Sequence, residues 1–239
     1  MAQFGIIAGA HRLWTHRSYK AKMPLQIILM LFNTMALQYS VNNWARDHRL
    51  HHRHSDTDAD PHNAARGFFF AHIGCFLVKK HPEVARRGKF TDLADLKANP
   101  VLRFQDKYYA PLVGVFFFLL PTITPVYFWG ESLNNAFFVN MFRFAVNLHA
   151  TLSVNSFAHL YGTRPYDKGI MPTQNFMVSI PSMGEGFHNY HHVFPWDYSA
   201  GQFIFSSVIM KRCAHGSAAG VERKRSTQIG LVGRMMGDR

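Results

Sequence analysis

The sequence contains almost no cysteine. Its two cysteines, Cys75 and Cys213, provide neither a disulfide framework nor a CxxC metal-binding pair. Any bound metal must therefore be held by nitrogen and oxygen ligands. Scarce cysteine also fits a reducing compartment that faces the cytosol. Residues 1–10 lack the charged n-region of a signal peptide, and we expect this apolar stretch to be the tail of a hydrophobic segment whose beginning is absent.

Acidic residues are also scarce. The 239 residues include 14 Asp and Glu against 26 Lys and Arg, which gives a formal net charge of +12. Such a balance suits an anionic partner: a nucleic acid, an anionic lipid, a phosphorylated cofactor or an acidic protein. We expect no nucleic-acid partner, because the basic residues are scattered around apolar segments and no nucleic-acid motif is present.

Histidine, in contrast, is abundant and follows a repeated pattern. Two HxxHH boxes occur among the 15 histidines, at residues 48–52 and 188–192. On a helix, the residues at i, i+3 and i+4 share one face, so each box would present three imidazoles together. Neutral imidazoles are good ligands for first-row metals. A lone histidine is more often a core or surface residue, but a repeated box predicts a metal site.

Other histidines complete the candidate ligand set. His11 and His16 are five residues apart, a spacing that one regular helix face serves poorly, so we expect a helix end that runs into a loop there. The metal ligands that we predict are His11, His16, His48, His51, His52, His159, His188, His191 and His192.

Nine imidazoles are too many for one ion and suit two ions with four or five ligands each. A structural zinc site would be closed by four ligands, and the glutamate of a zinc hydrolase box, HExxH, is absent. Carboxylates are few near the boxes, unlike in the Glu-rich di-iron sites of ferritin-like bundles. Nitrogen-rich sites with open positions favour redox iron, so the chemistry favours oxygen activation by two irons.

The apolar segments indicate a membrane protein. Residues 110–129 carry no charge over the length that crosses a hydrocarbon core, and residues 136–154 carry one, Arg143. Together they would form a transmembrane helical hairpin whose outer ends face the cytosol, because Lys and Arg flank it on that side; a soluble helical core is the alternative. Residues 24–44 become polar in their second half and predict a buried or interfacial helix. We therefore expect an all-α membrane protein whose cytosolic helical cap holds a histidine-rich di-iron site.

Seven stretches stand in order between Gly9 and Ala200: GAHRLWTHRSYKA, NTMALQ, WARDHRLHHRHSDTDADPHN, RGFFFAHIG, KKHPEV, NSFAHLYGTRPYDK and GEGFHNYHHVFPWDYSA. In sequence and spacing they resemble the membrane-bound acyl-CoA desaturases, the stearoyl-CoA desaturase family. The resemblance implies a multi-pass oxidoreductase of fatty acid biosynthesis in the endoplasmic reticulum membrane. It also implies that the nine histidines hold two Fe(2+) ions on the cytosolic side.

The resemblance implies roles for polar residues around the metals. Asn155 matches a family position that reaches a metal through water. Arg46 and Asp47 match positions that contact the acyl-CoA. Lys79 and Lys80 fall where basic side chains meet the phosphates of coenzyme A, which suits a charge-assisted contact.

The resemblance also implies the reaction. Gln38 and Trp44 match positions that line a long apolar tunnel, although plain core packing is the alternative for Trp44. The tunnel would fix which methylene faces the metals, where O2 is used to remove two hydrogens and leave a cis double bond. The chain has no flavin, nicotinamide or haem motif, and family members take electrons from cytochrome b5 and its NADH-dependent reductase. The basic surface would steer that acidic carrier.

The chain departs from the family pattern in several places. The family's first membrane hairpin would precede His11, so we expect one desaturase domain over residues 1–239, N-terminally truncated and with a divergent basic tail at 201–239. Leu152 stands where vertebrate relatives carry Trp, and Tyr39 where they carry Asn. Residues 170–174 (IMPTQ) resemble the delta-11 group of insect desaturases more than the delta-9 groups.

Three other functions are open at the level of sequence. A histidine-box hydroxylase of alkyl chains or sterols would use the same irons and yield an alcohol instead of an alkene. A zinc transporter or metal-storage protein would carry ligands inside its spanning helices, but residues 110–129 contain no histidine. An inactive membrane remnant would keep the boxes without the fold.

Overall fold

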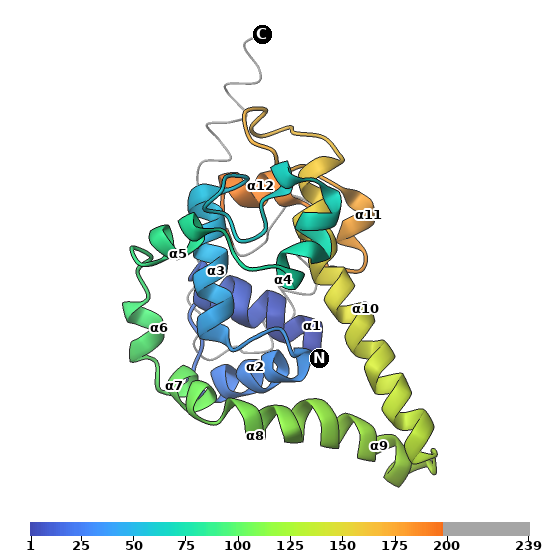
Figure 1. Ribbon diagram of the computed structural model, residues 1–239. Helices are drawn as coiled ribbons and strands as arrows, with labels where there is room; N and C mark the ends of the chain where they lie inside the picture. Colours follow the sequence, from blue (N-terminus) through green and yellow to red (C-terminus); the bar gives the residue numbers. More distant parts are fainter. Residues whose placement is uncertain (198–239) are drawn as a thin grey trace.

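The computed structural model describes residues 1–197, which fold almost entirely into helices (Figure 1). Within this range there is no strand, and two isolated β-bridges join Thr163 to Gln174 and Gln174 to Phe187. The predicted all-α class is therefore confirmed. The basic tail that we expect at 201–239 lies outside the described residues.

The N-terminal segment is one buried helix. It consists of α1 (Ala2–Phe4) and η1 (Gly5–Thr15), which has the wider hydrogen bonding of a π-helix. Helix α2 (Met23–Ala36) packs against it, and a Cβ atom at Gly5 would collide with the backbone of Asn33. Only glycine allows the two backbones to approach so closely. The apolar stretch at residues 1–10 therefore belongs to the core of the described fold.

A sharp corner separates α2 from α3 (Val41–His54), the helix that carries the first histidine box. The two helices meet at an angle of 82°. Leu37 and Tyr39 turn the chain there, with backbone φ angles of 51° and 68°. We expected one helix over residues 24–44, and this is wrong: the polar residues that follow Ala36 belong to the corner and to the start of α3.

The side chain of Gln105 holds the corner between α2 and α3 in place. It lies in α7 (Pro100–Lys107) and is fully buried. Its Oε1 accepts a hydrogen bond from the amide of Val41 at 2.9 Å, and its Nε2 donates to Asn33 at 2.9 Å and to Thr34 at 3.0 Å. One side chain thus satisfies the first amide of α3 and two polar side chains of α2, which fixes the direction in which the histidine box points.

Shorter helices wrap the side of α3. Residues 55–66 form a turn-rich loop that ends in η2 (Ala64–Arg66), and are followed by η3 (Phe70–Gly74) and α4 (Cys75–Leu77). Helices α5 (Pro82–Gly88) and α6 (Ala94–Ala98) then lead to α7. Asn99 caps the start of α7 and Pro100 is its first residue, so this pair separates α7 from α6.

The longest apolar run is a continuous helix made of α8 (Tyr109–Val113), η4 (Gly114–Leu119) and α9 (Leu120–Trp129). Among residues 1–197, Tyr109–Trp129 is the one unbent helix that is long and apolar enough to cross a membrane. Most of this helix is exposed in the fold. The bent pair α2 and α3 is long and apolar enough only when the two helices are taken together. The second segment of the expected hairpin is the middle of α10 (Leu133–Leu160), which carries Arg143 and several asparagines. Figure 1 shows α10 rising from the turn after α9 towards the histidine boxes.

A side chain of α10 supplies the hydrogen bond that a proline removes from the backbone of this apolar helix. Pro121 has no amide hydrogen to donate to the carbonyl of Phe117, four residues earlier. Asn140 of α10 donates its Nδ2 to that oxygen at 2.8 Å, and the Asn140 side chain is buried. The contact explains how a proline is accommodated in an apolar helix, and it ties η4 to α10.

The two histidine boxes meet at the top of the molecule as drawn in Figure 1. Here α3 lies beside α12 (His188–Val193), and α10 ends close to both, with α11 (Phe176–Ser179) on its outer side. Residues 162–186 connect α10 to α12 mainly through turns. The fold thus brings the first box, on α3, together with two helices that follow much later in the sequence, α10 and α12.

We predict that replacing Gln105 with Leu destabilises the fold. The substitution roughly conserves volume but leaves the amide of Val41 and the side chain of Asn33 without their buried partner, which costs about 1–3 kcal/mol per group. Denaturant unfolding in detergent micelles measures the effect. The control Arg103→Ala, at an exposed position of the same helix, should change the free energy of unfolding by less than about 0.5 kcal/mol. Equal stability of Gln105→Leu and the unmodified protein would contradict the proposed role of the corner.

Candidate metal centre

All nine predicted histidines converge in the structure. They form two groups, and within each group the potential ligand atoms lie within 4.8 Å of one another. The five-histidine group consists of His11, His16, His48, His52 and His191. The four-histidine group consists of His51, His159, His188 and His192. The other histidines of residues 1–197, among them His54 and His62, join neither group.

Each histidine box serves both groups. In α3, His48 and His52 belong to the five-histidine group, whereas His51 belongs to the four-histidine group. In α12, the i+3 residue His191 belongs to the five-histidine group, and its neighbours of the box belong to the other. The two groups are therefore held at a fixed separation by two short helices, and neither group can form without the other being close.

The spacing of His11 and His16 has its own structural cause. The amide of His16 donates to the carbonyl of His11 at 3.1 Å, which is the i to i+5 hydrogen bond of a π-helix. This wider turn brings residues five apart to the same side of η1. We expected a helix end that runs into a loop, and His16 is indeed the residue that caps η1; the π-helical geometry was not expected.

The distances between ring nitrogens are those of ligands on a shared ion. Six Nε2–Nε2 distances within the groups lie between 2.9 and 3.3 Å. Two nitrogens bound about 2.0–2.1 Å from one metal ion are roughly 2.9–3.4 Å apart for bond angles between a right angle and the tetrahedral angle. The two groups therefore have the dimensions of two metal sites.

Hydrogen bonding between the rings cannot account for these contacts. His191 Nε2 lies 2.9 Å from the Nε2 atoms of both His11 and His52, but a neutral ring places at most one hydrogen on that atom. The Nε2 atom of His16 is buried and has no hydrogen-bond partner among residues 1–197. Several lone pairs thus face a common point, and a cation at that point would satisfy them. The residues present fit two metal ions.

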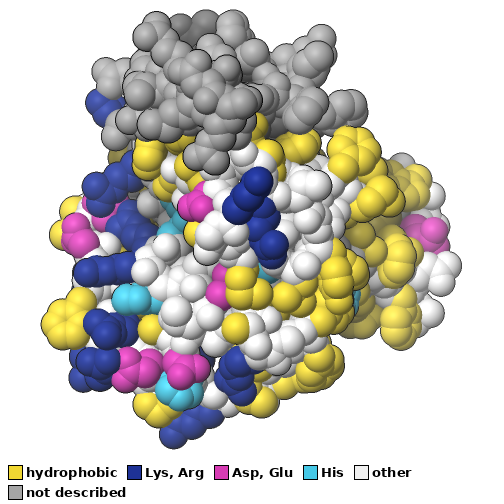
Figure 2. Space-filling model, turned by 90° about the horizontal axis from the view of Figure 1, so that it is seen from above, with side chains coloured by type: hydrophobic (Ala, Val, Ile, Leu, Met, Phe, Trp, Pro, Cys, Tyr) yellow, Lys and Arg dark blue, Asp and Glu magenta, His cyan; other side chains and the backbone are white. Residues whose placement is uncertain are grey.

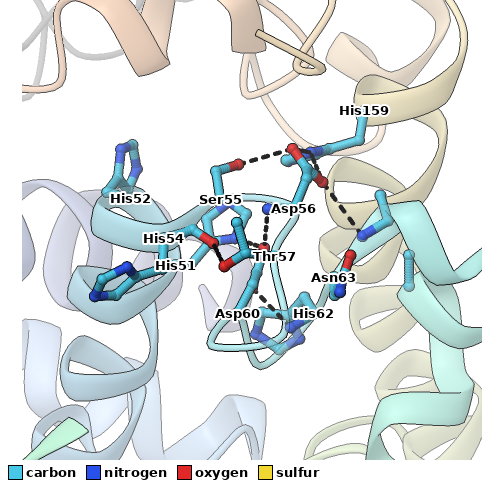
Figure 3. Close-up of polar contacts among 12 residues, drawn as sticks. His51, His52, His54, Ser55, Asp56, Thr57, Asp60, His62, Asn63 and His159 are labelled. Carbon is cyan, nitrogen blue, oxygen red and sulfur yellow. Dashed lines mark hydrogen bonds and ion pairs between the residues drawn. The ribbon is translucent and has the colours of Figure 1, made fainter. Parts of the chain in front are cut away.

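Carboxylates orient three of these rings, and Figure 3 shows two of the pairs, His51 with Asp60 and His159 with Asp56. Asp60 accepts a hydrogen bond from His51 Nδ1 at 2.8 Å, and Asp56 accepts one from His159 Nδ1 at 3.1 Å. Glu185 lies 3.1 Å from His11 Nδ1. A carboxylate can only accept, so each Nδ1 carries the hydrogen and each Nε2 keeps its lone pair for a metal.

Sequence reasoning missed these carboxylates. We expected few carboxylates near the boxes, and this is wrong: Asp56 and Asp60 stand immediately behind the first box, in the stretch HSDTDADPHN. The alternating aspartates of that loop were a usable signal. Glu185 could not have been recognised, because it reaches His11 only through the tertiary fold. Arg12 also pairs with Glu185 at 2.6 Å.

The electrostatics of the pocket keep most of the rings neutral, as metal binding requires. Burial, reinforced by the neighbouring histidines, holds the pKa well below its usual value for His16, His48, His52, His188, His191 and His192. Burial also acts to lower the pKa of His51, but the adjacent Asp60 outweighs it and the net shift is upward. Glu185 stays ionised: burial opposes this, but Arg12 and His11 bring its pKa to about 2.

Arg49, inside the first box, clamps the η1 helix to α3. Its guanidinium donates two bonds of 2.8 Å to Asp95 of α6, and further bonds to the carbonyls of Trp14 at 2.7 Å and Thr15 at 3.2 Å. These carbonyls immediately precede His16. Arg49 therefore sets the position of His16 relative to the histidines of its own helix, and the bidentate pair with Asp95 gives that position a fixed geometry.

An apolar cavity of about 580 Å³ ends at the metal groups. Its wall includes His11, His48 and His188, and also Asn155, which the resemblance assigns to a water-mediated metal contact. The cavity is lined mainly by aliphatic and aromatic side chains from η1, the α2–α3 corner, α4 and α10. A long apolar molecule bound in this cavity would lie against the histidines.

The structure brings most of the predicted substrate residues to this cavity. Gln38, Trp44, Asp47 and Lys80 line it, and Trp44 also stacks on His48 with ring centroids 4.7 Å apart. Arg46 is attached to this set through an ion pair of 3.0 Å with Asp47, which Lys80 also contacts. Lys79 is exposed and is not part of the lining.

Cys75 and His62 are two of the lining residues that were not predicted to have a role. Cys75 is buried in the cavity wall, and His62 Nδ1 lies 3.5 Å from its sulfur. Burial raises the pKa of the Cys75 thiol to about 11, so this cysteine is an apolar wall residue at neutral pH. Burial also lowers the pKa of His62, to about 4, so its ring is neutral. Tyr39 and Leu152, which depart from the vertebrate pattern, line the same cavity.

We predict that His51→Ala removes metal from the four-histidine group. The total metal content should fall to about half, because the five-histidine group keeps all of its ligands. Elemental analysis of the purified chain measures this. His54→Ala is a matched control, since His54 lies one turn further along the same helix and joins neither group. Metal content that is equal in the two variants would contradict the ligand role of His51.

A second prediction concerns the carboxylate behind His51. Asp60→Asn should weaken metal affinity by about 10–100-fold, the usual effect of removing a carboxylate that orients a histidine ligand. Competition with a chelator measures the affinity. Asp58→Asn removes a charge from an exposed position of the same loop and should leave the affinity unchanged. An Asp60→Asn affinity that matches this control would show that the His51–Asp60 contact does not support metal binding.

Comparison with known proteins gives the family. A model of the family described as fatty acid desaturase matches residues 1–200. The chain is 60% identical over 208 residues to an acyl-CoA Delta(11) desaturase of Spodoptera littoralis, which covers 87% of this chain and 62% of that protein. It is 60% identical over 202 residues to an acyl-CoA Delta(11) desaturase of Choristoneura rosaceana, covering 84% of this chain and 60% of that protein.

A vertebrate relative matches over a longer range. The chain is 50% identical over 239 residues to the stearoyl-CoA desaturase of Homo sapiens, which covers 98% of this chain and 67% of that protein. The chain spans about three fifths of the length of the two insect relatives. The histidine boxes, the neighbouring acidic loop and the length of the match agree: this chain belongs to the fatty acid desaturase family.

Proposed function

We propose that the protein is an acyl-CoA desaturase, an oxidoreductase that inserts a cis double bond into a long-chain saturated fatty acyl-CoA. One observation carries the proposal: the wall of an apolar cavity includes histidines of both metal-sized groups. A saturated chain in that cavity would present an unactivated methylene directly to the metals. The relatives' names, Delta(11) desaturase and stearoyl-CoA desaturase, support the same reaction.

The metal in this proposal is iron, one Fe(2+) in each group. The nine histidines would be the ligands, and Asn155 would contribute through a water molecule. A ligand set made of neutral nitrogens, with positions left open towards a substrate cavity, favours redox iron over structural zinc. Bound iron would supply the activation of O2 that removal of hydrogen from a methylene requires. The chain's own contribution is to hold nine rings neutral and oriented at the end of the cavity.

Positioning of the acyl chain is the task of the cavity wall. Trp44 lines the cavity and stacks on His48, so it can fix the distance of a bound chain from the metals. Gln38 is buried in the wall and donates to the carbonyl of Asn147 at 3.5 Å. Apolar walls exclude water from the reacting carbon atoms, and a narrow channel selects one methylene by its distance from the entrance. The proposed position of the double bond is delta-11, as named for the two insect relatives, with delta-9 as the alternative.

The coenzyme A part would bind where the cavity reaches the surface. Lys80 and Asp47 line the cavity there, and Arg46 lies beside Asp47. Lys79 and Lys80 would meet the phosphates, and Arg46 and Asp47 would contact the rest of the head group. In the unbound protein Asp47 holds both Arg46 and Lys80, so binding of a phosphate would release Lys80 from its contact with Asp47.

The reducing equivalents must come from another protein. Each double bond formed with reduction of one O2 to two waters requires two electrons and two protons in addition to the two hydrogens taken from the chain. The sequence holds no motif for a flavin, nicotinamide or haem. We propose cytochrome b5, reduced by its NADH-dependent reductase, as the donor, because its acidic surface complements the basic charge of this chain.

The membrane arrangement that we propose is a helical hairpin in the endoplasmic reticulum membrane with the metal site on the cytosolic side. Tyr109–Trp129 and the middle of α10 would be its two arms. Figure 2 supports this division, since hydrophobic side chains cover the side of the molecule that carries α9 and α10, whereas Lys and Arg gather on the side that carries α5 and α6. One desaturase domain would extend over residues 1–239, with the basic stretch at 201–239 as its divergent part.

We predict that yeast lacking its own desaturase will accumulate new monounsaturated fatty acids when it expresses this chain. Gas chromatography with mass spectrometry identifies the product and the position of its double bond. The variant His51→Ala should abolish the product, because one metal group loses a ligand, whereas His54→Ala should retain it. Alcohols in place of alkenes would instead support a lipid hydroxylase that uses the same site. No new lipid, from protein that is folded and carries iron, would contradict both.

A further inference from the structure

The mouth of the acyl cavity is marked by the exposed residues of its lining. Most of the lining residues are buried or half-buried, and four are exposed: Tyr39, Phe76, Val78 and Lys80. Tyr39 lies in the corner between α2 and α3, whereas the other three lie in α4 and just after it. The cavity therefore opens between these two segments, and an acyl chain that enters or leaves must pass between them.

Two of the exposed residues stack on each other at this mouth. The ring planes of Tyr39 and Phe76 differ by only 14°, and the ring centroids are 6.1 Å apart. This is the geometry of offset aromatic stacking, which is attractive beyond the burial of the rings. Tyr39 nevertheless remains 51% exposed and Phe76 40% exposed. The stack thus joins the two segments between which the cavity opens.

The backbone at Tyr39 is held in an unusual conformation. Its φ angle of 68° lies in the left-handed region, which bulky residues rarely adopt. The neighbours on both sides, Gln38 and Ser40, are buried, so the fold fixes the residue between them. A conformation of this kind persists only where the surrounding structure enforces it, and such positions cluster at ligand clamps and active sites.

The two rings suit the part of the substrate next to the thioester. Lys80, at the same mouth, would meet the phosphates of coenzyme A, while His11 and His188 are buried in the inner part of the wall. The substrate segment between these two places is the thioester with its first methylenes, which carries no charge. Burial, followed by the charge of Asp47, raises the pKa of the Tyr39 phenol, so this ring stays neutral at physiological pH. Tyr39 and Phe76 therefore offer apolar faces to an uncharged segment.

We propose that Tyr39 and Phe76 form a clamp that closes the cavity mouth behind the acyl chain and slows the release of acyl-CoA. The proposal rests on the proposed function, because the molecule that the clamp retains is the substrate of the desaturase. Neither ring belongs to the metal groups, so both are positioning residues. Slow release keeps one methylene of the chain in place while O2 and the two electrons that each double bond requires arrive.

Dissociation kinetics test the clamp. The probe is radiolabelled stearoyl-CoA bound to the full chain in detergent micelles, and its release is followed after excess unlabelled stearoyl-CoA is added, without any reductant. We expect Tyr39→Ala and Phe76→Ala each to speed release by about 10-fold, because either substitution removes the stack. The double variant should release the probe no faster than the faster single variant, since the rings act as one unit. Tyr39→Phe keeps the ring and should retain slow release.

Two controls separate the clamp from general damage to the protein. Phe90→Ala removes a ring that is 71% exposed and lies between α5 and α6, outside the cavity lining, so release should not change. Free coenzyme A has no acyl chain to retain, and its affinity should be equal in Tyr39→Ala and in the unmodified protein. The clamp is refuted if Tyr39→Ala releases stearoyl-CoA at the unmodified rate. It is also refuted if this variant loses affinity for free coenzyme A to the same extent, or if the effects of the two alanine substitutions multiply.

The release measurement does not depend on the reaction, so this proposal and the proposed function can fail separately. Release that depends on both rings, in a chain that forms no alkene in yeast, would support the clamp and overturn the proposed reaction alone. Alkene formation by a chain whose release of stearoyl-CoA is indifferent to both rings would overturn the clamp alone.

Discussion

The structure depends on one electrostatic constraint: nine imidazoles share a buried volume in which a charged ring would be repelled by its neighbours. Burial and proximity therefore keep most of the rings neutral, and neutral rings present lone pairs. With Nε2 atoms about 3 Å apart, these lone pairs oppose one another unless cations lie between them. The rest of the molecule can be understood as the scaffold that holds this arrangement.

A few contacts of the scaffold set the directions of the helices and of the histidine rings. Gln105 sets the angle between α2 and α3, and Arg49 holds the end of η1 against the first box. The carboxylates of Asp56, Asp60 and Glu185 select the tautomer of the rings that they contact. Because each box divides its histidines between both groups, a small rotation of α3 or α12 would disturb two metal sites at once. This coupling explains why so many polar contacts converge on two short helices.

The ligand set could be predicted from sequence because local spacing encodes it. The HxxHH boxes place their rings together on any helix, and the structure assembles all nine predicted histidines. The division of each box between two groups could not be predicted, since it depends on how α12 lies against α3. Glu185 was missed for the same reason, and the π-helical turn between His11 and His16 has no spacing signal that distinguishes it from a frayed helix end. The 82° corner after Ala36 depends on Gln105, a residue almost seventy positions away.

The arrangement also gives a substrate direct access to the metal ligands. The acyl cavity meets the centre at His11, His48 and His188. This access has meaning only if iron occupies both histidine groups. The most direct test is X-ray absorption spectroscopy together with metal analysis of the purified chain. Our account predicts two irons per chain, each with a first coordination shell dominated by histidine nitrogen. A single metal ion per chain, zinc at full occupancy, or a shell dominated by carboxylate oxygen would contradict it.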